Sequence, residues 1–339
     1  MGAGMNSSVN QQIQSPSPRR RGPIAIAASA QSLTPVVRAP RLRGGGTLGV
    51  VLKSAVTLAF VAGLLLSPGA IAPALAQEGG PKLKAVSWPH EGPFGLFDQA
   101  SLQRGFQVYK EVCASCHSLI YLSYRDLGGK GGPGFKPAEV EAIAATAQVP
   151  AGPDDKGEIT DENGSLRMRP ALPSDHFAKP FPNEAAARAG NGGALPPDLS
   201  VIVNARHGGP AYIYSLIAGF EEGDKRPKCL GETPGKFYNP YFANGEVPDA
   251  CKDKNGKSTI EGTLIAMPPP LDPGRVDFAD GTPNTTEQMA KDVTAFLDWA
   301  AEPHMEARKM IGFQVMVYLL VLAGFFYVSY RHIWKDVDH

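Results

Sequence analysis

Three residues with reactive side chains stand close together, because Cys113, Cys116 and His117 form a Cys-x-x-Cys-His segment. Two thiols three positions apart can each add to one vinyl group of a haem, and the adjacent imidazole can then bind the iron. A redox dithiol would need a βαβ context, which the surrounding sequence does not suggest. A zinc site would need further Cys or His ligands, and none follows at a suitable spacing. The segment therefore predicts one covalently bound haem c, with His117 as the proximal ligand.

The second axial ligand is expected to be a methionine. Beyond the first 76 residues, methionines stand at positions 168, 267, 289, 305, 310 and 316. Met267 is favoured, because the three prolines that follow it fix the backbone and apolar residues flank it. Met289 fits a helix core, Met168 lies between two arginines, and the last three lie in or beside an apolar segment. A His/Met pair leaves no open position on the iron and is typical of an electron carrier.

Two amphipathic helices are predicted to hold this site. The first runs into the cysteine segment, because residues 102, 106, 109 and 113 fall on one helical face. The second, near the end of the chain, carries Met289, Val293, Phe296, Leu297 and Ala300 on one face, after a capping box of Thr285 and Gln288. Residues 128–198 are rich in Gly, Pro and Ala, and long surface loops are predicted there.

The charge pattern predicts one export signal and one membrane anchor. Residues 1–77 contain seven basic and no acidic residues, and an apolar run is followed by Ala74-Leu75-Ala76, as in a cleaved signal peptide. The alternatives to a cleaved signal peptide are an uncleaved first transmembrane helix and the first half of an organellar presequence. Residues 311–330 carry no charge and as a helix would span about 30 Å, the thickness of one hydrocarbon core. The expected organisation is a leader over 1–76, an exported haem domain over 77–305, an anchor over 306–331 and a cytoplasmic tail over 332–339.

The bulk composition predicts a domain with long irregular connections. The chain has 339 residues with a formal net charge of zero, so nothing indicates a nucleic-acid partner. Its 38 glycines and 31 prolines favour long connections over dense regular structure.

Several motifs in order resemble the cytochrome c1 family. They are residues 101–119, Leu195-Pro-Pro-Asp-Leu-Ser200, Ala205-Arg-His-Gly-Gly209, Met267-Pro-Pro-Pro-Leu271 and the C-terminal anchor. The resemblance implies a mostly α c-type cytochrome domain with long loop insertions and one C-terminal transmembrane helix.

The same resemblance implies roles for individual residues. It makes Cys113 and Cys116 the thioether links of a single haem c, with His117 and Met267 as the axial ligands. It also implies that Arg206 hydrogen-bonds a haem propionate, that Tyr212 lies near the haem and that Pro197 lines its edge.

The remaining two cysteines indicate a bacterial form. In an exported chain Cys229 and Cys251 most simply form a disulfide. Such a bridge, like the long loop over 128–191, resembles alphaproteobacterial rather than mitochondrial members. We therefore expect a single-pass protein of the bacterial inner membrane with its haem domain in the periplasm. The alternative is the mitochondrial inner membrane, with the domain facing the intermembrane space.

The implied function is electron transfer within ubiquinol:cytochrome c oxidoreductase, as a subunit that catalyses no bond chemistry. The implied partners are cytochrome b, the Rieske iron–sulfur protein and a soluble or anchored cytochrome c, in a dimeric membrane complex. Two alternatives remain at this point: an anchored electron carrier outside that complex, and a haem enzyme or ligand sensor with an open iron position.

Overall fold

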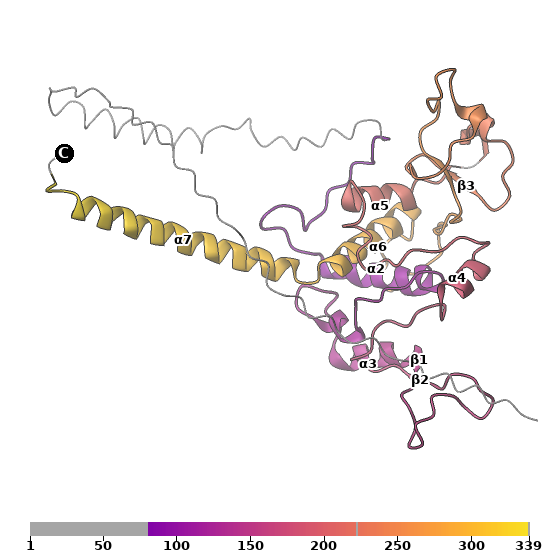
Figure 1. Cartoon of the computed structure of the whole chain (residues 1–339), viewed down its shortest axis with the longest axis horizontal. Helices are drawn as coiled ribbons and strands as arrows, with labels where there is room; N and C mark the ends of the chain where they lie inside the picture. Colours follow the sequence, from indigo (N-terminus) through magenta and orange to yellow (C-terminus); the bar gives the residue numbers. More distant parts are fainter. Residues whose placement is uncertain (1–80, 222, 338–339) are drawn as a thin grey trace, which may run out of the picture. The chain divides into compact units, whose positions relative to one another are not determined.

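The computed structural model describes residues 81–221 and 223–337, so the predicted leader over 1–76 lies outside the described residues. The described part is mostly helical, as predicted (Figure 1). Its helices are α2 (Gln99–Glu111), α3 (Pro137–Ala145), α4 (Glu184–Gly190), α5 (Gly209–Ile217), α6 (Thr286–Ala301) and α7 (Met305–Ile333). Its strands are β1 (Gln148–Pro150), β2 (Met168–Pro170), β3 (Phe237–Asn239) and β4 (Thr263–Ile265).

The centre of the fold is the packing of α2 against α6. At Gly105 the two helices approach so closely that an added Cβ would lie 2.1 Å from the Asp292 carbonyl oxygen and 2.7 Å from Phe296 Cβ. Only a residue without a side chain fits there. Around this contact, aromatic rings fill the core. Phe106 lies 5.7 Å from Phe296 and 6.2 Å from Phe177, measured between ring centroids.

A buried carboxylate fastens the same two helices. Asp292 on α6 is 1% exposed and accepts a 2.7 Å hydrogen bond from Arg104 Nε and a 2.6 Å bond from Ser101 Oγ, both on α2. The Gln288 side chain also donates to Asp292, at 3.0 Å. Because a charge out of water must be paired and hydrogen-bonded, these donors make the burial of Asp292 tolerable.

Helix α6 begins where the sequence predicted. Thr285 is its N-cap, and Thr285 Oγ1 accepts from the Gln288 backbone N–H at 3.2 Å. The predicted apolar face is buried, with Met289, Val293 and Phe296 each 0% exposed.

The segment predicted as loops contains more regular structure than expected. Helices α3 and α4 both lie within residues 128–198, and β1 pairs with β2 as an antiparallel two-stranded sheet. Pro137 opens α3, where a missing N–H costs nothing, and Asn183 caps α4. The prediction missed these elements because they are short and are stabilised by local caps more than by an apolar period.

A second, smaller core follows α5. Strand β3 pairs with β4 antiparallel, and Cys229 and Cys251 form a disulfide with an S–S distance of 2.06 Å and a sequence separation of 22. Leu230, Tyr238 and Cys251 are the buried centre of this core. The Asn239 side chain, itself 0% exposed, donates to the Leu216 carbonyl at 2.7 Å and thereby ties β3 to the end of α5.

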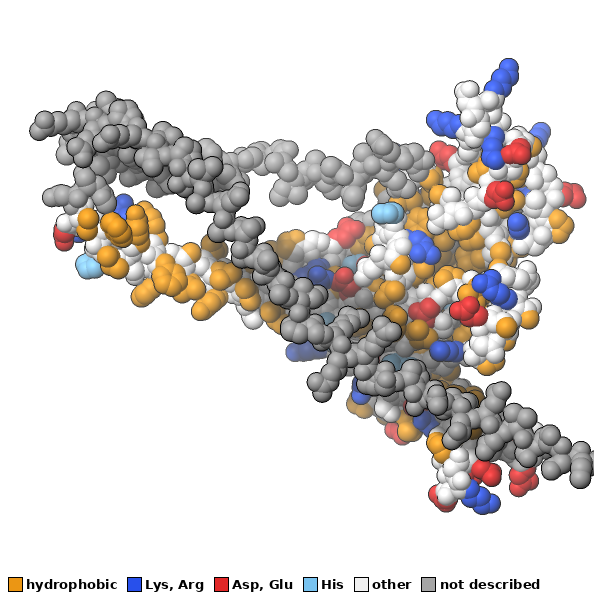
Figure 2. Space-filling view, viewed as in Figure 1, with side chains coloured by type: hydrophobic (Ala, Val, Ile, Leu, Met, Phe, Trp, Pro, Cys, Tyr) orange, Lys and Arg blue, Asp and Glu red, His pale blue; other side chains and the backbone are white. Residues whose placement is uncertain are grey.

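Helix α7 is the one helix among the described residues that is long and apolar enough to cross a membrane, with a mean hydropathy of 2.1 over its most apolar 18 residues. None of its residues is buried within the described chain. Figure 2 shows apolar side chains along its length. The uncharged residues 311–330 lie inside it, which fits the predicted single anchor.

Candidate haem site

The cysteine segment begins at the C-terminal end of α2. After Glu111 the chain tightens into a 3₁₀ turn over Cys113–Ser115, and the Cys113 carbonyl accepts from the backbone N–H groups of Cys116, at 3.1 Å, and His117, at 2.9 Å. The two thiols and the imidazole therefore all project from one short loop. Both thiols are free and half-buried, so they are available for attachment to another group.

The imidazole of His117 is oriented by a residue 80 positions away. His117 Nδ1 lies 2.8 Å from the Pro197 carbonyl oxygen. A carbonyl can only accept, so Nδ1 carries the hydrogen and Nε2 presents its lone pair. This is the arrangement of a metal-bound histidine, in which the second ring nitrogen donates to a carbonyl.

Three further bonds align the segment after Pro197 with the segment after His117. The Leu199 N–H donates to the Ser118 carbonyl at 2.9 Å. Asp198 Oδ2 accepts from the Ile120 N–H at 3.1 Å, and Ser200 Oγ accepts from the Tyr121 N–H at 3.1 Å. Asp198 and Ser200 are not among the predicted site residues, although both lie in the Leu-Pro-Pro-Asp-Leu-Ser motif. Their role depends on which segment pairs with which, and no local pattern carries that information.

Burial keeps the imidazole neutral. Desolvation lowers the pKa of His117, against the smaller opposing effects of the Pro197 carbonyl and the Asp198 charge. Desolvation likewise raises the pKa of the Cys113 thiol to about 12, and the neighbouring Cys116 adds to this. A neutral imidazole with a free Nε2 can bind iron.

Arg206 and Tyr212 lie near each other at the start of α5. Arg206 Nη1 donates to the Ala205 carbonyl at 3.0 Å, and the guanidinium is partly exposed. Tyr212 is 9% exposed, and its burial raises the pKa of the phenol while the Arg206 charge acts in the opposite direction. Gly208 adopts a φ of +88° as the N-cap of α5, and a Cβ there would lie 2.5 Å from Leu83 Cδ1. Gly208 is thus required by this turn.

Met267 lies two residues beyond β4 and is half-buried. The chain that follows it returns to the main core, where Leu271 is 5% exposed and its carbonyl accepts from Thr286 Oγ1 at 3.3 Å. Met289 is fully buried in α6, and Met168 on β2 is 50% exposed. Pro197 is exposed, and its carbonyl is the acceptor for His117.

The residues of this site fit a covalently attached haem better than the alternatives. Residues 81–221 and 223–337 contain no group of three or more His, Cys, Asp or Glu side chains placed to hold a metal ion, as a zinc site would need. The two sheets described are antiparallel pairs, so the βαβ setting of a redox dithiol is not found in this part of the chain.

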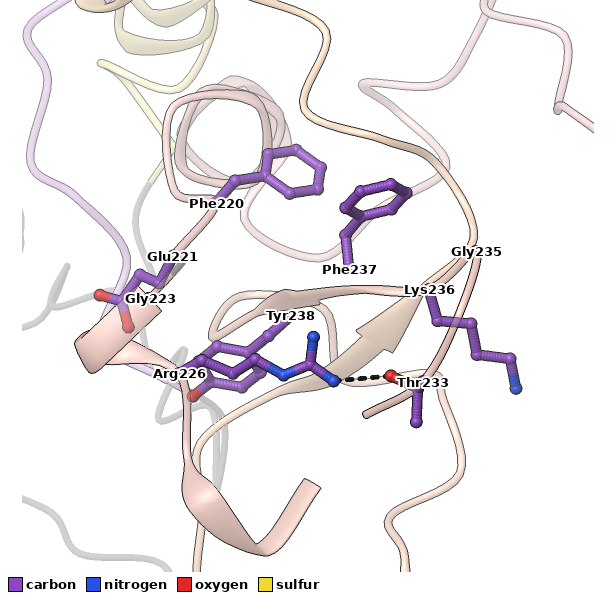
Figure 3. Close-up of a pocket in the computed structure, with 9 residues that line it drawn as sticks. All are labelled: Phe220, Glu221, Gly223, Arg226, Thr233, Gly235, Lys236, Phe237 and Tyr238. Carbon is purple, nitrogen blue, oxygen red and sulfur yellow. Dashed lines mark hydrogen bonds between the residues drawn. The ribbon is translucent and has the colours of Figure 1, made fainter. Parts of the chain in front are cut away.

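A separate cavity of about 330 Å³ lies away from these residues, in the second core (Figure 3). Phe220, Phe237 and Tyr238 contribute to its wall, and Arg226 donates to Thr233 Oγ1 at 2.6 Å. None of the predicted site residues lines this cavity.

The α2–α6 helix pair, the Cys-x-x-Cys-His turn and the apolar helix α7 together define a c-type cytochrome domain on a membrane anchor. The family model of the Cytochrome C1 family matches residues 88–337. The chain therefore belongs to this family, and the resemblance derived from its motifs is confirmed.

Named relatives agree with this assignment. The chain is 42% identical over 301 residues to "Cytochrome b/c1" of Bradyrhizobium diazoefficiens, with 84% of this chain and 40% of that protein covered. It is 39% identical to "Cytochrome c1" of Rhodospirillum rubrum, covering 82% of this chain and 96% of that protein. It is 44% identical to "Cytochrome c1, heme protein, mitochondrial" of Saccharomyces cerevisiae, covering 72% of this chain and 69% of that protein. The chain thus spans less than half of the first relative and nearly all of the second.

Proposed function

We propose that this chain is the haem-bearing electron-transfer subunit of a ubiquinol:cytochrome c oxidoreductase. The observation that carries the proposal is the His117–Pro197 hydrogen bond beside two free thiols, in a chain of the cytochrome c1 family. Such a chain catalyses no bond chemistry itself. A haem c held there would supply one-electron oxidation and reduction.

The chain's own residues have distinct tasks in this proposal. Cys113 and Cys116 would attach one haem covalently through thioethers, and His117 Nε2 and the Met267 sulfur would bind its iron. Arg206 neutralises a propionate carboxylate, for which a planar guanidinium is well shaped. Around them, Tyr212 and Pro197 limit the access of water.

The proposed partners follow from the family and from the anchor. Electrons would arrive from a Rieske iron–sulfur protein and leave to a soluble or anchored cytochrome c, with cytochrome b beside the anchor in a dimeric complex. The haem domain over 77–305 would face the periplasm and the tail over 332–339 the cytoplasm. The mitochondrial inner membrane is the alternative setting, since relatives come from both bacteria and mitochondria.

Purification from native membranes tests this proposal directly. The protein should co-purify with a cytochrome b and an iron–sulfur subunit, carry one covalent haem, and become reduced when ubiquinol is added. A purified, haem-loaded protein that lacks both partner subunits would instead favour an anchored carrier outside the complex.

Replacing the sixth ligand tests the site. The Met267→Leu variant keeps the side-chain volume but removes the sulfur, so its reduction potential should fall and the reduced protein should bind carbon monoxide. Met168→Leu is the matched control, because this exposed methionine should leave both properties unchanged. An unchanged spectrum in Met267→Leu, or carbon monoxide binding by the unaltered protein, would contradict the ligand set.

A further inference from the structure

The chain that precedes α2 folds back onto the beginning of the membrane helix. Residues 90–97, which we call the strap, are joined to the first turns of α7 by three hydrogen bonds. The Phe97 N–H donates to Glu306 Oε1 at 2.8 Å. Lys309 Nζ donates to the His90 carbonyl at 2.6 Å and to the Gly95 carbonyl at 3.1 Å. The strap is thus held at the point where α7 leaves the globular domain.

Two large apolar side chains of the strap point away from the protein. Phe94 is 73% exposed and Leu96 is 58% exposed. Phe94 also contacts α7, since its ring lies 5.7 Å from that of Phe313 in an edge-on arrangement. By contrast, His90 is 4% exposed and stacks on Phe97 at 4.3 Å, so the strap has an inner face toward the domain and an outer apolar face.

The level at which Phe94 lies beside α7 indicates the environment of this outer apolar face. Phe313 is the third residue of the uncharged stretch 311–330, so it lies only about 3 Å inside that stretch at 1.5 Å per residue. Lys309, two residues before the first residue of this stretch, is at the polar edge. Phe94 therefore stands at the level where a membrane-spanning helix passes from the headgroup region into hydrocarbon.

Three backbone groups of the strap are also suited to a region of low water content. Polar groups without partners are costly there. In the strap the carbonyls of His90 and Gly95 and the N–H of Phe97 all have side-chain partners on α7. The Lys309 ammonium group donates hydrogen bonds to these two carbonyls. Without them it would need water as its hydrogen-bond partner.

We propose that the strap is a membrane-contacting element, in which Phe94 and Leu96 insert into the lipid interface beside the anchor. Together with the bonds to Glu306 and Lys309, this insertion gives the haem domain a second attachment to the bilayer and restricts its rotation about α7. The proposal rests on α7 crossing a membrane and not on the redox role of the domain.

Site-specific photo-cross-linking in native membranes tests this inference on the full-length, assembled protein. Phe94 is replaced by p-benzoylphenylalanine, which preserves an aromatic ring, and the unchanged haem spectrum checks folding. The same substitution at Met316, 58% exposed on α7, is the positive control, and at Leu172, 54% exposed after β2, the negative control. After irradiation, adducts are identified by mass spectrometry as lipid or polypeptide.

We expect lipid adducts at position 94 that exceed those at position 172 at least tenfold and approach those at position 316. Polypeptide adducts in place of lipid at position 94 would overturn the inference, because another subunit would then cover the strap. Lipid adducts at position 316 together with none at position 94 would equally refute it, since the outer face would then lie in water.

Discussion

Asp198 holds the segment that orients His117, so its removal should weaken the site without changing any of the proposed ligands. Its Oδ2 accepts from the Ile120 N–H at 3.1 Å, and its Oδ1 accepts from the Ser200 N–H at 2.9 Å. Ser200 is fully buried and Ile120 half-buried, so neither N–H can readily exchange its partner for water. In the Asp198→Ala variant both donors are left without a partner.

The expected size of the effect follows from these two bonds. A hydrogen bond to a charged group contributes about 1.5–3 kcal/mol, and an unsatisfied buried donor costs a similar amount. Asp198→Ala should therefore lower the free energy of unfolding by about 3 kcal/mol or more. Asp198→Asn retains one acceptor oxygen but turns an amide N–H toward the other donor. It should therefore lower the free energy of unfolding by about half as much as Asp198→Ala.

Urea unfolding of the purified, haem-loaded protein in detergent, followed by the haem absorption band, measures this change. With a slope of about 3 kcal/mol per molar urea, the midpoint of Asp198→Ala should fall by about 1 M. The reduction potential should also rise, because a His117 ring that no longer donates firmly to Pro197 is a weaker base toward the iron. Asp155→Ala removes an exposed carboxylate and should shift the midpoint by less than about 0.2 M.

Two results would refute the reasoning on Asp198. A midpoint within 0.2 M of the unaltered protein would mean that the two N–H groups find other partners. An Asp198→Asn variant as unstable as Asp198→Ala would show that the negative charge matters and the number of acceptors does not.

Three further outcomes are expected. Replacing Cys229 and Cys251 by serine should lower the free energy of unfolding by about 3 kcal/mol, the value for a loop of this length, measured by denaturant unfolding; an unchanged midpoint would contradict it. The hydrogen bond from Arg169 lowers the pKa of Asp175 to about 2, so this carboxylate stabilises β2 above the ordinary carboxyl pKa near 4, and the stabilisation should disappear as the pH falls toward 2. The protection of the β2 amides against hydrogen exchange, corrected for the intrinsic pH dependence of exchange, should fall over that range, and Arg169→Ala should abolish this fall. A chain ended after Glu302 should keep its haem and its potential but assemble poorly with cytochrome b, as judged by co-purification; loss of haem ligation would show that the anchor shapes the site.

The sequence alone determined the features that depend on local spacing. Cys113, Cys116 and His117 are neighbours in the chain, so their chemistry could be read without a fold. The α6 core face and the uncharged stretch in α7 are periodic or continuous patterns, and burial or membrane insertion is their direct physical consequence. The motif order was enough to identify the family, because several separated segments had to agree.

The tertiary structure alone decided which distant segments meet. His117 and Pro197 are 80 residues apart, and their bond depends on the pairing of two irregular segments that have no periodicity. The hydrogen bonds from Arg104 and Ser101 to Asp292 also join groups far apart in the chain, as do the bonds between the strap and α7. No local rule specifies the partners of these side chains. Helices α3 and α4 escaped prediction because they are short Ala- and Glu-rich stretches inside a segment whose Gly and Pro content favours loops. Helices this short form where caps and tertiary packing offset the entropy of ordering them.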